Sequence, residues 1–499
     1  MPRPHPDTVS AVLARGRLGI PAVVFFVVAA AAPLTAVAGG ATTGYAVTGV
    51  LGIPLAYLVV AAVLALFAVG YVAMSRRIVN AGAFYTYVTR GLGRPAGVAA
   101  AMIALVAYNS MQIGLYGVFG AVLSGFLNDR FGMDTTWWLC AVIACAVIAV
   151  LGLLRIDLNG KVLAVLLVAE CVIALVYDAV MVARPVNGLG VSFDTLAPGN
   201  LIGPGLGAAL VTGIAGFVGF EGTTVFAEET KDPKRTVPRA TYIAVAVTGL
   251  LYGLSAWAMS VATGPDQIVA AAQTEGTDLI FNLVSPHLTS SLVTLGRWLF
   301  ITSLFAALLS FHHTVARYAF ALGRERVLPS VLGRTSRRTG APKAGSILQT
   351  ALALVVLAGY VLADADPIVH LFFWLTSLGA LGVLILMTAT SVAVISYFTR
   401  IAHDDDGRWR TTLAPFLSAL ALGAILVVTV EQFDALLGVE PTSLLRWMFP
   451  ASYAVAAATG LAWASVLRDA RPEVYQTIGL GADSSTAPLR SPDPVRQPA

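Results

Sequence analysis

The feature that most constrains this chain is a succession of apolar runs, each long enough to form a helix that crosses a bilayer. Such a helix needs about 20 consecutive, predominantly apolar residues. Twelve runs approach or exceed this length, and an even number places both chain ends on one side of the membrane. We place them near residues 19–40, 50–74, 96–126, 136–154, 160–183, 203–226, 240–262, 291–321, 345–363, 367–398, 411–431 and 445–467.

Composition excludes a water-soluble fold. Of the 499 residues, 57% are hydrophobic and only 12% are charged, about half the charged share of a soluble protein. The formal net charge of +4 comes from basic residues in short connections between apolar runs, which is an orientation signal rather than a nucleic-acid surface. We therefore expect an all-α integral membrane protein, with the lipid bilayer as a partner and no nucleic acid.

Basic residues gather in alternate connections between the predicted spans. The first set comprises Arg76, Arg77, Arg90, Arg94, Arg155, Lys161, Lys231, Lys234, Arg235, Arg239, Arg324, Arg326, Arg334, Arg337, Arg338, Lys343, Arg400, Arg408 and Arg410. The opposite set comprises only Arg130, Arg184 and Arg446. The positive-inside rule therefore places the first set and both termini in the cytoplasm. We expect the membrane to be the plasma membrane.

Two of the predicted spans carry helix-breaking residues. The first span contains Pro33, and the sixth contains four glycines, Gly213, Gly216, Gly219 and Gly222, beside the carboxylate of Glu221. Backbone groups freed inside a membrane must be buried in protein or line a cavity. Interrupted helices in matching positions of two repeats indicate a transport site near the bilayer midplane. The alternative is that these residues merely allow close helix packing.

An odd number of spans in each repeat, one to five and then six to ten, predicts that the second repeat is inverted in the membrane. The expected organisation is a cytoplasmic segment 1–18, a first repeat 19–183, a second repeat 203–398 and two further spans in 411–467. Residues 473–499 are rich in Ser, Pro, Ala and Asp, so we expect a disordered cytoplasmic tail.

Four motifs carry a resemblance to a known family. They are residues 217–221 (FVGFE), 227–240 (AEETKDPKRTVPRA), 80–87 (NAGAFYTY) with 91–93 (GLG), and 317–329 (RYAFALGRERVLP). The chain resembles the amino acid–polyamine–organocation (APC) superfamily of permeases, of the bacterial amino acid permease type, over about residues 15–470. One departure is the sequence Ala32-Pro33-Leu34, where the family usually carries a Gly-x-Gly pair.

The resemblance implies a leucine-transporter-like fold of twelve transmembrane helices, with a five-plus-five inverted repeat and two extra C-terminal helices. It also implies secondary transport of an amino acid or an amine. We expect this activity to need no cofactor. A polyamine or organic cation carrier and an amino acid exchanger are alternatives within the same fold. We expect neither an enzyme nor a channel, because the sequence shows no nucleophile motif and the interrupted spans favour alternating access.

The two interruptions predict how a zwitterionic amino acid would bind. Unpaired amides at residues 32–36 suit its carboxylate, with help from the Thr35 hydroxyl, and freed carbonyls at residues 216–220 suit its ammonium. Phe217 and Phe220 would supply apolar walls, or they simply pack. The candidate substrate-binding residues are Ala31, Ala32, Pro33, Leu34, Thr35, Ala36, Tyr108, Gln112, Gly216, Phe217, Val218, Gly219, Phe220 and Glu221.

Buried polar residues in the spans allow a functional and a structural interpretation. Glu221 either contacts the substrate ammonium or holds a hydrogen bond at the helix break. Tyr108 and Gln112 share one face of the third span with Tyr116, and such residues often only join helices. Glu170 falls where some proton-dependent relatives carry a lysine, which implies proton coupling. The alternative is a Glu170 that bonds to span one or eight without such a role.

Charges at the inner end of the sixth span also allow two interpretations. Glu228, Glu229 and the residues from Lys231 to Arg239 either form salt bridges with the basic loop 324–338 that close an inner gate, or remain solvated. We expect no metal site and no disulfide, because Cys140, Cys145 and Cys171 all fall inside apolar spans.

Overall fold

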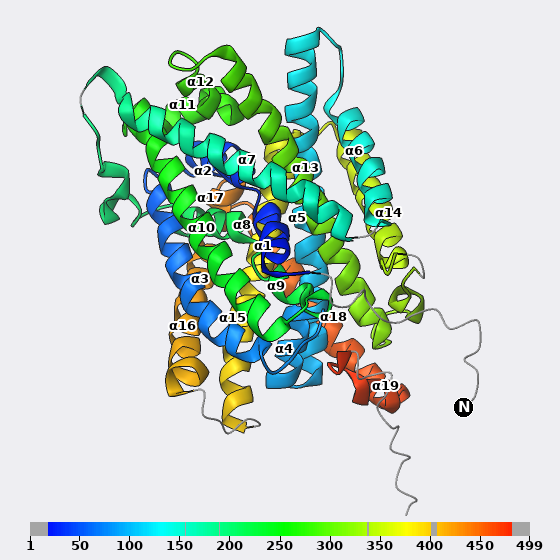
Figure 1. The fold of residues 1–499 in the computed structure, drawn as a ribbon. Helices are drawn as coiled ribbons and strands as arrows, with labels where there is room; N and C mark the ends of the chain where they lie inside the picture. Colours follow the sequence, from blue (N-terminus) through cyan, green and yellow to red (C-terminus); the bar gives the residue numbers. More distant parts are fainter. Residues whose placement is uncertain (1–17, 155, 189, 337–338, 401–406, 482–499) are drawn as a thin grey trace, which may run out of the picture.

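The computed structural model describes residues 18–154, 156–188, 190–336, 339–400 and 407–481, with the backbone alone for 156–164 and 187. The predicted N-terminal segment 1–18 therefore lies outside the described residues except for Leu18. Throughout the described part, regular structure is helical, and the isolated bridge that pairs Leu18 with Thr230 is the single contact of β type. The chain forms an all-α bundle (Figure 1).

Eleven helical segments in the described chain are long and apolar enough to cross a membrane. Six of them are single helices: α3 Ile53–Ser75, α5 Arg94–Phe131, α10 Pro233–Thr263, α13 Ser290–Arg324, α14 Lys343–Leu362 and α18 Leu445–Ala470. Four consist of more than one element: Ile20–Thr48 (α1 Ile20–Ala31, a π-helical turn Thr35–Ala41 and α2 Thr42–Thr48), Leu206–Val225 (α8 Leu206–Phe217 and α9 Gly222–Val225), Pro367–Arg400 (a π-helical turn Pro367–Phe373 and α15 Trp374–Arg400) and Trp409–Glu431 (with α16 Ala414–Glu431). The remaining one is the Val165–Ala183 part of α7 (Ile156–Ala183). The predicted span at 136–154 corresponds to α6 (Trp137–Gly152), an apolar helix of 16 residues.

Short helices cover the two ends of the bundle. Helices α4 (Ala83–Leu92) and α19 (Pro472–Thr477) lie at one end, which we call the α4 end. Helices α11 (Ile268–Glu275) and α12 (Leu279–Val284) lie at the opposite end, where α11 packs on α2. Figure 1 shows both groups, with α7 crossing the bundle obliquely between them. A further short helix, α17 (Phe433–Leu437), connects α16 to α18.

The interrupted spans lie at the centre of the bundle. Within their most apolar stretches, 89% of Leu206–Val225 and 72% of Ile20–Thr48 is buried, against 28% for α14 and for α18. The outer helices instead present large apolar side chains such as Val355 and Val455 to the surroundings. Contiguous apolar surface of this kind fits a bilayer and not water. The chain is a multi-pass membrane protein.

The expectation of a disordered tail from residue 473 is wrong for residues 473–481. This part contains α19 and continues in an ordered segment whose Val474 and Ile478 are buried. These apolar side chains pack against the bundle, and backbone amides further along bind a buried carboxylate described below. The rest of the predicted tail, 482–499, lies outside the described residues.

Candidate functional site

The first span is interrupted at Ala32, where α1 has ended. Ala32 adopts a left-handed backbone conformation, with φ 44° and ψ 80°, which is unfavourable for a residue that carries a Cβ. Pro33 accounts for the departure from the helix, because its ring disfavours the right-handed α conformation in the residue before it. The carbonyl of Ala31 is satisfied by the hydroxyl of Tyr252 at 2.7 Å.

This first interruption leaves fewer free amides than the sequence suggested. The amide of Ala32 donates to the Val28 carbonyl, and that of Ala36 to the Ala32 carbonyl, each at 2.9 Å. The backbone amide of Leu34 bonds to the carboxyl of Glu170. The prediction of unpaired amides is therefore wrong for Ala32, Leu34 and Ala36. The reason is that the break is one residue wide, so helical bonding resumes directly after it.

The second interruption is wider and depends on a glycine. Between Phe217 and Gly222 the chain leaves the helix, with Val218 extended and Gly219 at φ 116°, a conformation that favours glycine. The Phe217 carbonyl accepts from the Phe220 amide at 3.1 Å, and the Gly219 carbonyl accepts from the Gly222 amide at 2.9 Å. The prediction of free carbonyls is therefore wrong for Phe217 and Gly219, since the turn uses them.

The two interruptions lie against each other. A Cβ added to Gly219 would sit 2.6 Å from the Cβ of Ala30, so the close approach requires glycine at this position. Helix α1 contacts α9 directly, in agreement with this proximity. The break in the sixth span is thus packed beside the last turn of α1.

A pocket with a cavity volume of about 50 Å³ lies beside the two interruptions. This volume is smaller than that of typical small-molecule sites, roughly 300–1,000 Å³, so a solute of amino acid size requires the pocket to widen. The residues that line it are Ala30, Ala31, Ala32, Thr35, Ala36, Gly40, Met111, Leu115, Thr212, Ala215, Gly216, Ala307, Phe311, Phe372, Phe373, Thr376 and Ser377. They come from the first, third, sixth, eighth and tenth predicted spans, so the pocket lies inside the helical bundle.

The pocket brings together only part of the predicted substrate site. Its lining includes the candidates Ala31, Ala32, Thr35, Ala36 and Gly216. The remaining candidates lie outside this lining; they are Pro33, Leu34, Tyr108, Gln112, Phe217, Val218, Gly219, Phe220 and Glu221. Substrate contact by any of these residues stays a prediction.

Glu221 is bound on both carboxyl oxygens by groups of the protein. The Tyr108 hydroxyl donates to Oε1 at 2.5 Å, and the amide of Gly219 donates to Oε2 at 3.0 Å. The backbone carbonyl of Glu221 accepts from the hydroxyls of Tyr71 and Thr224, both at 3.0 Å. These bonds favour the structural interpretation, in which Glu221 and Tyr108 hold the shape of the second interruption.

Other candidates outside the pocket also make contacts that hold the bundle together. Phe217 packs against Tyr57 and Tyr252, and Phe220 packs edge-on against Phe67. These contacts agree with the packing interpretation of the two phenylalanines.

Gln112 belongs to a buried polar cluster away from the pocket. Its side chain bonds to Gln349 of α14 and lies 3.3 Å from Nδ1 of His312, whose other ring nitrogen lies 2.7 Å from the Ser346 hydroxyl. These contacts join α5, α13 and α14, so the structure places Gln112 as a link between helices.

Glu170 is buried directly behind the first interruption. Besides the Leu34 amide, the hydroxyl of Ser303 on α13 bonds to its carboxyl, and its Oε2 has no partner among the described residues. The hydroxyl of Thr35, which lines the pocket, lies 3.3 Å from that of Ser303. A short polar path therefore connects Glu170 to the pocket. Glu170 contacts both span one and span eight, as the structural alternative anticipated.

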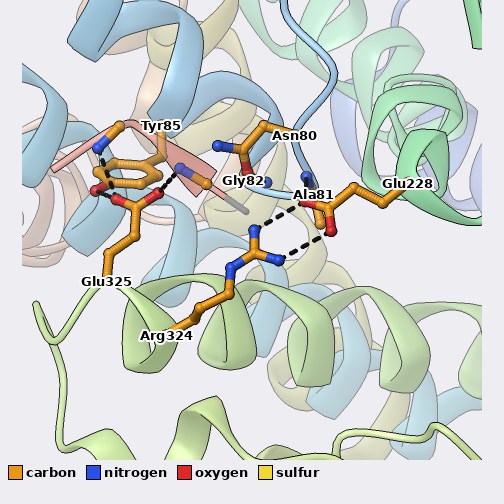
Figure 2. Close-up of polar contacts among 9 residues, drawn as sticks. Asn80, Ala81, Gly82, Tyr85, Glu228, Arg324 and Glu325 are labelled. Atoms are coloured by element: carbon orange, nitrogen blue, oxygen red, sulfur yellow. Dashed lines mark hydrogen bonds and ion pairs between the residues drawn. The ribbon is translucent and has the colours of Figure 1, made fainter. Parts of the chain in front are cut away.

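Ion pairs lie at the α4 end of the interrupted spans. Arg317 on α13 forms a bidentate pair with Glu229, with nitrogen–oxygen distances of 2.6 and 3.3 Å, and both side chains are buried. Arg324 binds Glu228 in the same manner at 2.9 and 2.8 Å, and the amide of Ala81 also donates to Glu228 at 3.0 Å (Figure 2). Of the two interpretations for Glu228 and Glu229, the structure supports salt bridges.

Glu325 extends these contacts to the C-terminal segment. Its carboxyl accepts from the Tyr85 hydroxyl and from the amides of Gly479 at 2.6 Å and Gly481 at 2.7 Å (Figure 2). Burial raises the pKa of the Glu325 carboxyl, whereas the bonds from Tyr85 and Gly479 oppose that shift. We call Glu228, Glu229, Arg317, Arg324 and Glu325 the α4-end cluster.

The sequence interpretation missed the pocket walls that come from the third, eighth and tenth spans. Met111 and Leu115 are one helical turn apart on α5, and Ala307 and Phe311 are one turn apart on α13. Phe372 belongs to the π-helical turn before α15. The only signal in the sequence is this one-turn spacing of apolar residues, which is common to every helix in the chain.

Comparison with known proteins gives consistent matches. A family model described as amino acid permease matches residues 18–450. The chain is 23% identical over 396 residues to the low-affinity putrescine importer PlaP of Escherichia coli strain K12, covering 77% of this chain and 82% of that protein. It is 24% identical over 409 residues to the branched-chain amino acid permease BcaP of Lactococcus lactis subsp. cremoris, covering 75% and 81%. It is also 28% identical over 234 residues to cationic amino acid transporter 7, chloroplastic, of Arabidopsis thaliana, covering 45% and 35%.

Proposed function

The chain belongs to the amino acid permease family, in agreement with its APC-type motifs, and on this premise we propose that it carries an amino acid across the plasma membrane by alternating access, coupled to protons. The observation that carries the proposal is the pocket beside two interrupted helices at the centre of the bundle. Interrupted helices offer backbone polarity and helix ends to a small solute inside the membrane. A polar solute that enters the pocket exchanges its hydration for the helix ends and for the hydroxyl side chains of the lining.

The proposal includes the five-plus-five inverted repeat, with spans in 19–183 and 203–398 and two additional spans in 411–467. The interruptions lie in the first and the sixth predicted span, which are equivalent positions in such a repeat. The α4 end carries the basic connections around Arg76, Arg90 and Arg324, so it is the cytoplasmic side under the positive-inside rule.

Alternating access requires contacts that close one end and can be released. The pairs Arg317–Glu229 and Arg324–Glu228 join α13 to the chain that follows α9, and the Leu18 amide donates to the Glu229 carbonyl at 3.1 Å. Together they tie the start of the first span and the end of the sixth span to α13. We propose that these contacts form the cytoplasmic gate and that they separate when the pocket opens inward.

Glu170 is the proposed proton-coupling residue. The path from its carboxyl through Ser303 to Thr35 ends in the pocket lining, and the Leu34 amide lies within the first interruption. Gain or loss of a proton at Glu170 changes which of these groups it holds, and so changes the backbone that meets the substrate. Coupling follows when one protonation state favours substrate binding and the other favours release.

An amine carrier of the same fold is the second candidate, because one relative is named a putrescine importer. Uptake of labelled amino acids and putrescine into proteoliposomes, with and without an inward proton gradient, tests both proposals. We expect wild type to accumulate an amino acid only under the gradient, and Glu170→Gln to equilibrate it without accumulation. Identical accumulation by both proteins would exclude the coupling role of Glu170. Absence of uptake for every compound by correctly inserted protein would exclude the transport function.

A further inference from the structure

The pocket at the two interruptions has uncharged walls. Its polar side chains are all hydroxyls, from Thr35, Thr212, Thr376 and Ser377. The other lining residues are alanine, glycine, methionine, leucine and phenylalanine. Among the described residues that line the pocket, none is Asp, Glu, Lys, Arg or His. The walls therefore supply hydrogen bonds and apolar contact but no counter-ion.

The two buried carboxylates that bond to residues of the interruptions are held outside the pocket lining. Glu221 accepts from Tyr108 and Gly219 within the turn of the second interruption. Glu170 faces Leu34 and Ser303 behind the first interruption and does not reach the lining. A cationic group on a substrate side chain would thus meet no opposite charge in the pocket wall.

Charge balance then separates the candidate substrates. A zwitterion carries one positive and one negative group, which the partial charges at helix ends and the hydroxyls of the lining can solvate together. A diamine, or an amino acid with a charged side chain, brings an additional unpaired charge into a water-poor site. Burial of an unpaired charge is strongly unfavourable.

We propose, resting on the transport function above, that the substrate is an amino acid with an apolar, uncharged side chain, and that Met111 and Leu115 determine which side chains fit. These two residues form one wall from α5, and Ala307 and Phe311 add apolar surface from α13. Met111 is held in place by α15, because a Cβ added to Gly379 would lie 2.7 Å from its sulfur. Thioether and aliphatic walls bind hydrocarbon side chains through burial of apolar surface.

Thr212 supplies a polar contact for the part that all amino acids share. It is buried, it lines the pocket on α8, and its hydroxyl has no hydrogen-bond partner among the described residues. A buried hydroxyl without a partner is unfavourable until a ligand satisfies it. The Thr212 hydroxyl is therefore positioned to bind the charged end of the substrate, leaving the apolar wall for the side chain.

Competition in proteoliposomes tests the proposal. Uptake of labelled leucine would be measured against unlabelled leucine, valine, methionine, lysine, glutamate and putrescine. We expect the apolar amino acids to inhibit at concentrations at least tenfold lower than lysine, glutamate or putrescine. If lysine or putrescine is transported in preference to leucine, the proposed substrate class is wrong although the protein is a transporter. If no compound is transported, the transport function itself fails.

A pair of methionine variants on one helix tests the specificity role. Met111→Ala removes wall atoms from the pocket, and Met102→Ala makes the same change on α5 at a residue that does not line it. Loss of a few methylene-sized groups shifts pocket discrimination by roughly 10-fold or more. We expect Met111→Ala to shift preference from leucine toward phenylalanine by about tenfold, and Met102→Ala to leave the ratio unchanged. Equal ratios in Met111→Ala and wild type would overturn the assignment.

Discussion

The pocket and the α4-end cluster differ in the chemistry of their side chains. The pocket is lined by small and apolar residues with four hydroxyl side chains and no charge among its described lining. The α4-end cluster is built from buried ion pairs, in which Arg317 and Glu229 are 3% and 2% exposed. In the proposed transport cycle, the pocket binds and releases a solute through weak contacts, whereas the α4-end cluster holds one end closed through strong, specific bonds. Substitutions should therefore change recognition in the first region and stability or gating in the second.

The largest effect is expected where a buried ion pair loses one partner. Arg317→Ala leaves the Glu229 carboxylate buried without its charge partner, and such a change destabilises by about 3–5 kcal/mol. Thermal unfolding of the purified protein in detergent measures the loss. The control is Arg297→Ala, which breaks a more exposed pair with Asp278 and should change stability by about 0–1 kcal/mol. Equal losses in the two variants would contradict the stabilising role of the α4-end cluster.

The next effect concerns the bond between the cluster and the C-terminal segment. Glu325→Ala removes the acceptor of the Gly479 and Gly481 amides and of the Tyr85 hydroxyl, so these donors lose their partner. Leaving buried donors unsatisfied costs about 1–3 kcal/mol each, reduced where water can enter. Hydrogen exchange of the 472–481 backbone should become faster while that of α5 stays unchanged. Unaltered exchange at 472–481 would show that Glu325 does not hold this segment.

Substitution of Glu221 tests whether this residue stabilises the second interruption or contacts the substrate. In Glu221→Gln one carboxyl oxygen becomes an amide donor that faces either the Tyr108 hydroxyl or the Gly219 amide. We expect stability to fall by about 1.5–3 kcal/mol, the range for a lost hydrogen bond to a charged group. The order of substrate preference should not change, because Glu221 does not line the pocket. A changed preference with unchanged thermal stability would instead establish direct substrate contact.

The smallest effect is expected at Thr212. Thr212→Val removes a hydroxyl that has no partner in the described structure, so stability should stay the same or rise slightly. Substrate affinity should fall by about fivefold, equivalent to one hydrogen bond of about 1 kcal/mol. Binding would be measured by isothermal titration with leucine. A loss of stability without a loss of affinity would place Thr212 with the structural residues.

The two interruptions could be predicted because their causes are local. Pro33 disfavours helix at Ala32 through its own ring, and Gly219 permits a backbone conformation that other residues avoid. Both causes are visible in the chain without any knowledge of neighbours. The width of each interruption was not predictable, because the bonds that resume after Ala32 depend on how the next turn packs.

The pocket walls could not be predicted because they depend on which neighbour each helix face meets. The one-turn spacing of Tyr108 and Gln112 correctly gives a shared face. On that face, Tyr108 bonds to Glu221, and Gln112, one turn further on, contacts polar side chains of α13 and α14. The adjacent face, with Met111 and Leu115, is the one that lines the pocket. Sequence spacing alone cannot distinguish the two.

The C-terminal segment is ordered where the sequence predicted disorder. Its composition indicates disorder, yet Val474 and Ile478 are spaced by one helical turn and pack on the bundle. A short apolar pair of this kind is weak evidence in sequence, because a single turn is not stable alone. Here the Gly479 amide of the segment bonds to the carboxyl of Glu325, which is far away in the chain and comes near only in the folded structure.

Protection of Thr212→Cys from alkylation by bound substrate tests most directly whether the pocket beside the two interruptions is the substrate site. The measurement uses a background in which Cys140, Cys145 and Cys171 are replaced by alanine, and it requires that the variant still transports leucine. Saturating leucine should slow labelling of Thr212→Cys severalfold, while the same concentration of putrescine should leave it unchanged. Leucine transport with a labelling rate that leucine does not alter would contradict the account.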